Sequence, residues 1–287
     1  MKITRDKIYH QFIPEIAPQI HISSGDKLTV ETFDAAGGRF TEGSVYTRPN
    51  PATGPIYVNG ALPGDTLEIE IHDIKVTGKG YINIPIGGEY RELKIESLPD
   101  GNLRLLDNDI IFPASPMIGV IGVAAPANSP DAHFSIETGD YGGNMDNNAV
   151  KAGAKVYLPV FVEGALLGLG DIHAIMGDGE VFGQGIEICA EVDITVTVKK
   201  DMKISRPIVI TDKIISAAAS AATMEQASEL AVSDMRHILE KYYGLQSSEA
   251  ALAVAFYGNL RVCQIVNPQK TMRMEIQKEK LKFIRPQ

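Results

Sequence analysis

The chain has 287 residues, of which 44% are hydrophobic and 22% charged, a composition typical of a globular protein with a sizeable core. Its formal net charge is −9 and it has no lysine- or arginine-rich stretch, which argues against nucleic-acid binding. No apolar run is long enough to span a bilayer, and the N-terminal residues lack the apolar core of a signal peptide, so we expect a cytoplasmic protein without a membrane partner.

The first two hundred residues predict many short strands separated by turns that contain Gly and Pro. The segments "GDKLTVETFD" (25–34) and "GDTLEIEIHD" (64–73) alternate apolar and polar residues and share five residues at matching offsets. This similarity favours an internal duplication or two equivalent hairpins. In "IEICAEVDITVTVKK" (186–200) apolar and polar residues also alternate, which predicts a further strand. Many short strands indicate a sandwich or a barrel.

The last third of the chain changes character. A helix is predicted to begin after Thr223 and to end at Gly244, and "SSEAALAVAFYGNL" predicts a second, largely buried helix before the chain returns to strand. We therefore expect an α+β, predominantly β fold, a sandwich- or barrel-like core with a helical pair inserted late. Residues 1–200 should form a β-rich domain that carries the active site, and residues 201–287 an α+β part packed on it.

The stretch "GLGDIHAIMGDGE" (168–180) concentrates three carboxylates and one histidine among glycines. On a strand, residues two apart point the same way, so Asp171 and His173 should project from one face. A carboxylate and an imidazole suit a metal such as zinc. The spacing alone leaves open a plain acidic hairpin with a surface histidine.

The residues that follow add carboxylates. A turn at 177–179 should bring Asp178 and Glu180 back towards the same rim, and Glu187 begins the next strand on its polar face. Oxygen ligands flanked by Gly-rich backbone also suit calcium. Asp178 and Glu180 are therefore candidates for the catalytic metal or for a structural calcium ion.

A second polar cluster lies in "HFSIETGDYGGNMDNN" (133–148). It has the composition of a long polar loop, but loops held by a rigid scaffold often carry functional sites. One apolar strand separates it from the first cluster, so the two can face each other. Its candidate residues are Glu137, Gly142, Gly143, Asn144 and Asp146.

Four segments together resemble the acetamidase/formamidase family of amide hydrolases: "GDIHAIMGDGE", "GGNMD", "MIGVIGVAAP" and "TGPIYVNGALPGDTLEIEI". The resemblance runs from "HISSGDKLTVETFDAAGG" to "GNLRVCQIVNPQKTMRMEI", nearly the whole chain. It implies a β-rich fold and an amidase that hydrolyses small aliphatic amides of the formamide and acetamide type to a carboxylate and ammonia. It also implies a divalent metal, with zinc the first choice and calcium the second.

The family motif falls on Asp171, His173, Asp178, Glu180, Asn144 and Asp146. We expect Asp171, His173 and Asp146 as metal ligands, with Asp178 and Glu180 as further ligand candidates. Asn144 is a candidate substrate contact. Met176 stands where the family usually has Gln, so it is a substrate-contact candidate that bears on substrate preference.

Amide hydrolysis also needs a proton carrier and a site for the developing oxyanion. We expect Glu137 or Glu187 as the general acid and base. The backbone N–H groups of Gly142 and Gly143 are candidates for holding the oxyanion, because glycine allows close approach of the backbone.

Two other functions stay open at this stage. One is a hydrolase of a cyclic or larger amide, and the other is a non-catalytic β-sandwich that binds a small ligand. We also expect a homodimer or a higher homo-oligomer, because a β-rich protein has sheet edges to cover.

Overall fold

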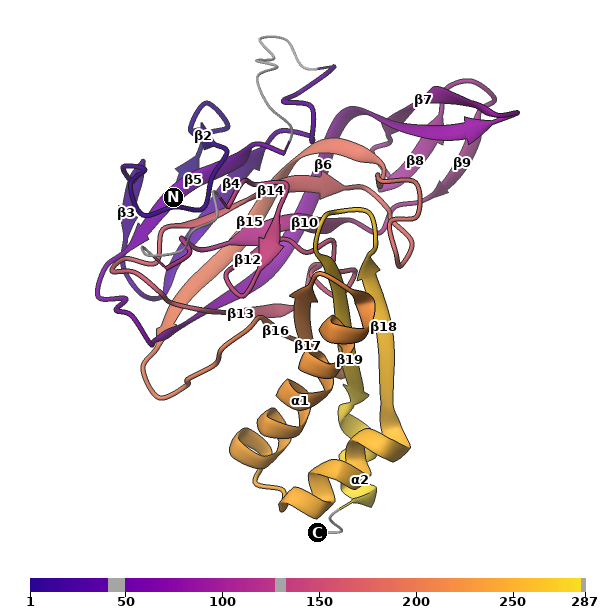
Figure 1. The fold of residues 1–287 in the computed structure, drawn as a ribbon. Coiled ribbons are helices and arrows are strands. Elements are labelled where there is room, and N and C mark those ends of the chain that lie inside the picture. Colours follow the sequence, from indigo (N-terminus) through magenta and orange to yellow (C-terminus); the bar gives the residue numbers. More distant parts are fainter. Residues whose placement is uncertain (41–49, 127–132, 285–287) are drawn as a thin grey trace.

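The computed structural model describes residues 1–40, 50–126 and 133–284 (Figure 1). These residues form a curled sheet, and the helices come late in the chain, so the expected α+β, predominantly β fold class is confirmed. The earlier strands are β1 Lys2–Ile3, β2 Ile8–Tyr9, β3 Ile20–Ile22, β4 Asp26–Thr32, β5 Ala52–Val58, β6 Thr66–Ile86, β7 Glu89–Ser97, β8 Asn102–Leu105, β9 Ile110–Pro113, β10 Met117–Gly122, β11 Thr138–Gly139, β12 Gly142–Asn144, β13 Lys155–Pro159, β14 Leu167–His173 and β15 Glu187–Lys199. The later elements are β16 Ile208–Ile210, β17 Ile214–Ala221, α1 Met224–Tyr243, α2 Ser247–Tyr257, β18 Gly258–Gln264, β19 Lys270–Gln277 and the 3-10 helix η1 Lys278–Phe283.

Strand β15 connects two parts of the sheet that have similar sequences. It pairs antiparallel with β4 on one side and with β6 on the other, and Val192 lies opposite both Val30 and Ile74. The two similar segments of the sequence therefore flank the same strand. Val192 and Ile194 are buried whereas Asp193 is exposed, so the predicted alternation is present from Ala190 onward, but Glu187 and Cys189 at the start of β15 are buried as well.

A second ladder brings together the segments that carry the candidate site. Strand β10 pairs antiparallel with β12 on one side and with β14 on the other. Strand β14 also pairs with β5, and at its end His173 lies opposite Glu187 of β15. The two polar clusters therefore lie side by side as expected, but the strand between them in the sheet is β10 and not β13, which separates them in the sequence.

The C-terminal part extends the first ladder, because β6 also pairs with β13. Strand β13 pairs with β16, β16 with β17, β17 with β19, and β19 with β18. Helices α1 and α2 pack near these strands (Figure 1) and enclose a second apolar core with them. Because the ladder crosses residue 200 without a break, the division into two domains stays a prediction. None of the helices in the described ranges has the length and apolarity that crossing a membrane requires.

The ends of helix α1 are as predicted. The Thr223 hydroxyl accepts a hydrogen bond from the backbone N–H of Gln226, and Gly244 ends the helix in the left-handed conformation. Helix α2 is less buried than its sequence predicts. Ala250 and Ala253 face the core, while Leu252 and Phe256 are 46% and 66% exposed. Its sequence is apolar all round, so no polar face marks the side that stays exposed.

Candidate metal centre and active site

The candidate site forms where β14, β10 and the segment after β12 meet. Asp171 and His173 lie at the end of β14, and Asp146 comes two residues after β12. The backbone N–H of Asp146 donates to the carbonyl oxygen of Gly119 in β10, which fixes that segment beside β14. Residues 25 positions apart in the sequence are thereby placed side by side.

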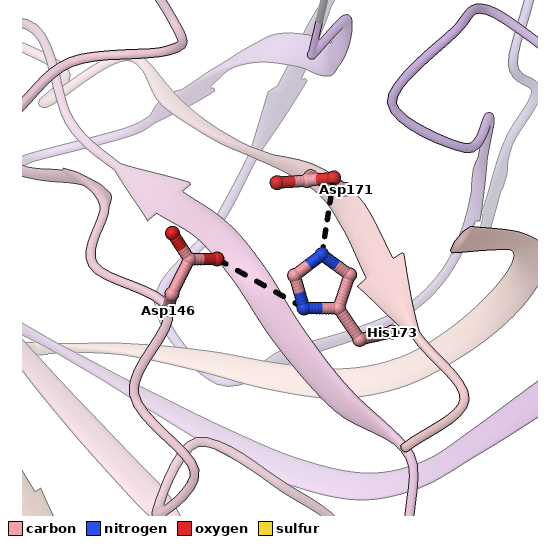
Figure 2. A group of neighbouring side chains, drawn as sticks. All are labelled: Asp146, Asp171 and His173. Carbon is pink, nitrogen blue, oxygen red and sulfur yellow. Dashed lines mark ion pairs between the residues drawn. The ribbon is translucent and has the colours of Figure 1, made fainter. Parts of the chain in front are cut away.

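Asp146, Asp171 and His173 form a compact buried group (Figure 2). Each offers a ligand atom, and these atoms lie within 4.8 Å of one another. The Nε2 atom of His173 is 3.5 Å from Oδ1 of Asp171, and its Nδ1 atom is 3.9 Å from Oδ1 of Asp146. The expected pairing of Asp171 and His173 is therefore present, with Asp146 as the third member.

The polar atoms of this group lack ordinary hydrogen-bond partners. Among the described residues, neither carboxylate oxygen of Asp146, nor Oδ1 of Asp171, nor either ring nitrogen of His173 has one. Leaving buried polar and charged groups unsatisfied costs free energy. A divalent cation would satisfy these atoms together, so the residues present fit a metal ion.

Two neighbouring features support this fit. A side chain at Gly119 would collide with the group, because a Cβ atom there would lie 2.7 Å from Oδ1 of Asp146 and 2.9 Å from Oδ2 of Asp171. Asn50 donates from Nδ2 to Oδ2 of Asp171 at 2.9 Å and so orients that carboxylate. Such outer contacts are typical of metal sites, where they fix the ligand geometry.

Two further carboxyl groups border the group. Oε1 of Glu187 is 3.2 Å from Nε2 of His173, and its Oε2 accepts a hydrogen bond from the backbone N–H of Ala35 at 3.3 Å. Burial raises the pKa of Glu187 to about 8 and that of Glu180 to about 7. Both carboxyls therefore change protonation near neutral pH.

The protonation of the central group follows from the same surroundings. Burial, and then the charge of Glu180, hold the pKa of Asp146 well above its usual value. Burial opposes the charged form of His173, but the carboxylates of Glu187 and Asp171 outweigh that effect and raise its pKa. In the absence of a cation this cluster binds protons, as expected for crowded acidic groups.

A cavity of about 380 Å³ opens onto Asp171, Glu180 and Glu187, while Asp146 and His173 lie behind its lining residues. It is mostly polar, and several of its residues were not among the candidates from the sequence. It is lined by Asp171, Glu180, Glu187, Asn144, Asn50, Asn83, Asn267, Gln184, Arg39, Tyr81, Gly183, Ala35, Ala36 and Ile136. For Ala35, Ala36 and Arg39 the sequence "DAAGG" could have indicated a turn of defined shape. Asp34 in this turn accepts hydrogen bonds from the backbone N–H groups of Ala36, Gly38 and Arg39 and so shapes the cavity wall.

The structure places Asp178 apart from this group. Both of its carboxylate oxygens accept hydrogen bonds from the buried guanidinium of Arg273, at 3.0 and 2.9 Å, and Arg261 and Asn148 also contact it. A carboxylate neutralised by two arginines is a poor cation ligand. Of the pair expected at this rim, Glu180 lines the cavity and Asp178 does not.

Glu137, Gly142 and Gly143 have other contacts in the structure, and their expected roles stay predictions. Oε2 of Glu137 caps its own turn by accepting from the backbone N–H of Phe134, and Glu137 lines a different cavity. Gly142 and Gly143 pair with β10 on one side and β11 on the other. Their backbone is thus engaged in strand pairing, and their lack of side chains serves close packing of the strands.

The two expected substrate contacts have different surroundings. Asn144 lines the site cavity, and its Oδ1 atom is buried without a hydrogen-bond partner among the described residues. Met176 lines a separate, smaller groove that shares Glu180 and Gln184 with the site cavity. It therefore lies next to the site rather than in it.

The fold and this group define a β-rich protein with a buried histidine–carboxylate group, a candidate metal site, at the edge of a polar cavity. The profile of the Acetamidase/Formamidase family matches residues 1–90 and 113–237, and the chain belongs to this family. The matched ranges contain the three central residues and Glu187, but they end before the hairpin of β18 and β19.

Individual relatives agree with this assignment. The chain is 25% identical over 263 residues to a formamidase of Methylophilus methylotrophus, an alignment that covers 68% of this chain and 65% of that protein. The chain thus spans less than two thirds of the length of that curated relative. An acetamidase structure from Bacillus halodurans is 35% identical, with a TM-score of 0.89 over 99% of this chain and 100% of that one. A predicted acetamidase/formamidase from the thermophile Thermoanaerobacter tengcongensis is 36% identical, with a TM-score of 0.87 over 99% of this chain and 97% of that one.

Proposed function

We propose that this protein is a metal-dependent amidase that hydrolyses small amides to a carboxylate and ammonia. The observation that carries the proposal is the buried group of Asp146, Asp171 and His173, five of whose six side-chain polar atoms lack a hydrogen-bond partner among the described residues, and whose Asp171 lines a polar cavity. Family membership and the activities for which the relatives are named support the same reaction.

The ligand set favours zinc or a similar transition metal over calcium. Two carboxylates and one imidazole match the mixed oxygen and nitrogen ligands of catalytic zinc sites, whereas calcium prefers oxygen ligands alone. Asp146, Asp171 and His173 would hold the ion. When bound, such an ion polarises a carbonyl group and makes a water molecule a better nucleophile at neutral pH.

Glu187 is the residue best placed to move protons in this site. It contacts His173, lines the cavity and has its pKa raised to about 8 in the absence of a cation. We propose that it takes a proton from the attacking water and delivers it to the nitrogen of the leaving amine, which then departs as ammonia. The contact with the backbone N–H of Ala35 holds its carboxyl in position.

The direct test is ammonia release from formamide, acetamide and propionamide, with and without a chelator, together with elemental analysis of the purified protein. We expect chelator-sensitive release and about one equivalent of metal per chain. Asp171→Asn and His173→Ala should lose the metal and the activity together. Full activity in a metal-free protein would reject the proposal.

Two variants identify the proton carrier. Glu187→Gln should keep the metal and lose at least about 100-fold in kcat, which is the range contributed by a positioned acid or base. Glu137→Gln should change kcat little, because Glu137 caps a turn beside another cavity. The opposite result would assign the role to Glu137.

The substrate panel should include five- and six-membered lactams. Faster hydrolysis of a lactam than of any linear amide would support the function in which a cyclic or larger amide is the substrate. Metal binding without hydrolysis of any amide would instead support a small-ligand-binding protein.

A further inference from the structure

The hairpin of β18 and β19 lies beyond the residues matched by the family profile, yet it reaches the candidate site. Its turn connects Gln264 to Lys270, and within that turn Asn267 lines the site cavity together with Asp171 and Glu187. Asn267, 80 residues after Glu187 in the sequence, thus contributes to the wall of the cavity.

The turn is held in a defined shape by Gln264. This side chain is fully buried, and its Oε1 atom accepts from the backbone N–H groups of Val266 and Asn267, both at 2.9 Å. Its Nε2 atom donates to the carbonyl oxygen of Gln269 at 2.7 Å and to Oγ1 of Thr271 at 3.1 Å. The Gln264 side chain is therefore hydrogen-bonded to both ends of the turn that contains Asn267.

The hairpin is also fixed to the loop that carries Glu180. The backbone N–H of Gly179 donates to the carbonyl oxygen of Cys263 at 3.0 Å, and that of Ile265 donates to the carbonyl oxygen of Gly179 at 3.2 Å. The bidentate contact of Arg273 with Asp178 lies beside these bonds. The position of Asn267 relative to the site is thus set by several independent contacts.

Among the asparagines that line the cavity, one donor and one acceptor have no partner within the described residues, beside the unpartnered carboxylate oxygens of Asp171 and Glu180. Nδ2 of Asn267 is a buried donor, and Oδ1 of Asn144 is a buried acceptor. A primary amide offers the complement, a carbonyl oxygen that accepts and N–H groups that donate. Buried polar atoms of this kind are expected to find partners when a ligand fills the cavity.

We propose that Asn267 is a substrate-binding residue that donates from Nδ2 to the carbonyl oxygen of the substrate amide, while Asn144 accepts from the amide N–H. This inference rests on the proposed amidase function and extends it to a segment that the family profile does not reach. It also explains how an uncharged amide is selected in a cavity bordered by several carboxyl groups.

The test compares wild type with Asn267→Ala and Asn267→Asp, each saturated with the metal that supports activity. Asn267→Asp keeps the shape of the side chain and removes the donor. We expect kcat/KM for formamide and acetamide to fall about 10-fold in both variants, which corresponds to the loss of one hydrogen bond. Metal content and the thermal midpoint should stay at wild-type values.

Asn259→Ala is the matched control, because Asn259 is an exposed asparagine on the same hairpin whose side chain contacts only the carbonyl oxygen of Tyr257 among the contacts described. It should leave kcat/KM within twofold of wild type. An active wild type with both Asn267 variants also within twofold would overturn the inference alone. A wild type that releases no ammonia from any amide would reject the proposed function, and the inference would fall with it. If Asn267→Ala does not fold, Asn267→Asp decides the matter.

Discussion

Gly119→Ala should weaken metal binding although it changes none of the ligands. Gly119 lies in β10 directly beneath the buried group, and a Cβ atom there would be 2.7 Å from Oδ1 of Asp146 and 2.9 Å from Oδ2 of Asp171. It would also lie 2.8 Å from the backbone carbonyl oxygen of Asp171. The carboxylates can swing away, but the carbonyl cannot do so without moving β14. The substitution therefore displaces two ligand candidates and strains the strand that carries a third, His173.

The expected size of the effect follows from these contacts. Forcing one extra carbon atom into a packed site costs about 1–3 kcal/mol. Disturbing the contacts that orient metal ligands costs about 10–100-fold in metal affinity. Gly177→Ala is the matched control, because a Cβ atom at Gly177 would meet no atom within 4 Å. It makes the same chemical change in a nearby loop without the collision.

The assay is competition for zinc against a chelator of known affinity, combined with urea denaturation in the presence and absence of zinc. Gly119→Ala should bind zinc about 10–100-fold more weakly than wild type, while Gly177→Ala should match wild type. Equal zinc affinities for all three proteins would refute the assignment of Asp146 and Asp171 as ligands.

Three more predictions concern the acidic residues. When a chelator keeps the protein free of metal, Glu187 has a pKa of about 8 and Glu180 a pKa of about 7 in the folded state, against an ordinary value of 4.5. Between these pH values the folded protein therefore binds more protons than the unfolded chain. Because these pKa values are raised, the free energy of unfolding should fall as the pH rises from 5 to 8, by about 1.4 kcal/mol per pH unit for each extra proton. Urea denaturation at a series of pH values measures this trend, and zinc should abolish it. Asp178→Asn should lower the free energy of unfolding by about 1–3 kcal/mol, because it weakens the contacts with Arg273. The variant should still contain the metal in elemental analysis, and a loss of metal would show that Asp178 is a ligand. The free energy of unfolding of Glu180→Gly should be about 1 kcal/mol higher than that of Glu180→Ala, because residue 180 has a φ of +48° that only glycine adopts without strain. Equal free energies of unfolding would show that this strain is absent.

The parts of this protein that the sequence predicts best are those with local patterns. The alternation in β15, the ends of α1 and the same-face placement of Asp171 and His173 all follow from repeats of two or 3.6 residues. The meeting of Asp171 with Asp146 was also expected from the sequence, but for a different reason than the structure gives: the apolar strand between their segments in the chain, β13, pairs with β6 and β16, and the strand that joins them in the sheet is β10.

The parts that the sequence does not predict depend on contacts between distant segments. Nothing near Asp178 indicates that Arg273, 95 residues later, binds its carboxylate, and so it looks like another metal ligand. Asn50 lies 121 residues from Asp171, which it orients. Asn267 lies in a turn whose composition is ordinary for a loop. In each case the partner is selected by the three-dimensional arrangement of strands, which leaves no periodic trace in the sequence.

The backbone conformation at the site shows that three of its carboxylate residues lower the stability of the fold when no ion is bound. Asp146, Asp171 and Glu180 all have positive φ angles, of 46°, 53° and 48°. For residues with a side chain this conformation costs about 1–2 kcal/mol each, and burying their charges adds to that cost. A position selected only for stability would favour glycine at each of the three. Carboxylates are present there instead, which is expected at a site where strain and burial serve binding. The free energy of binding a cation would offset the loss of folding stability that these residues cause.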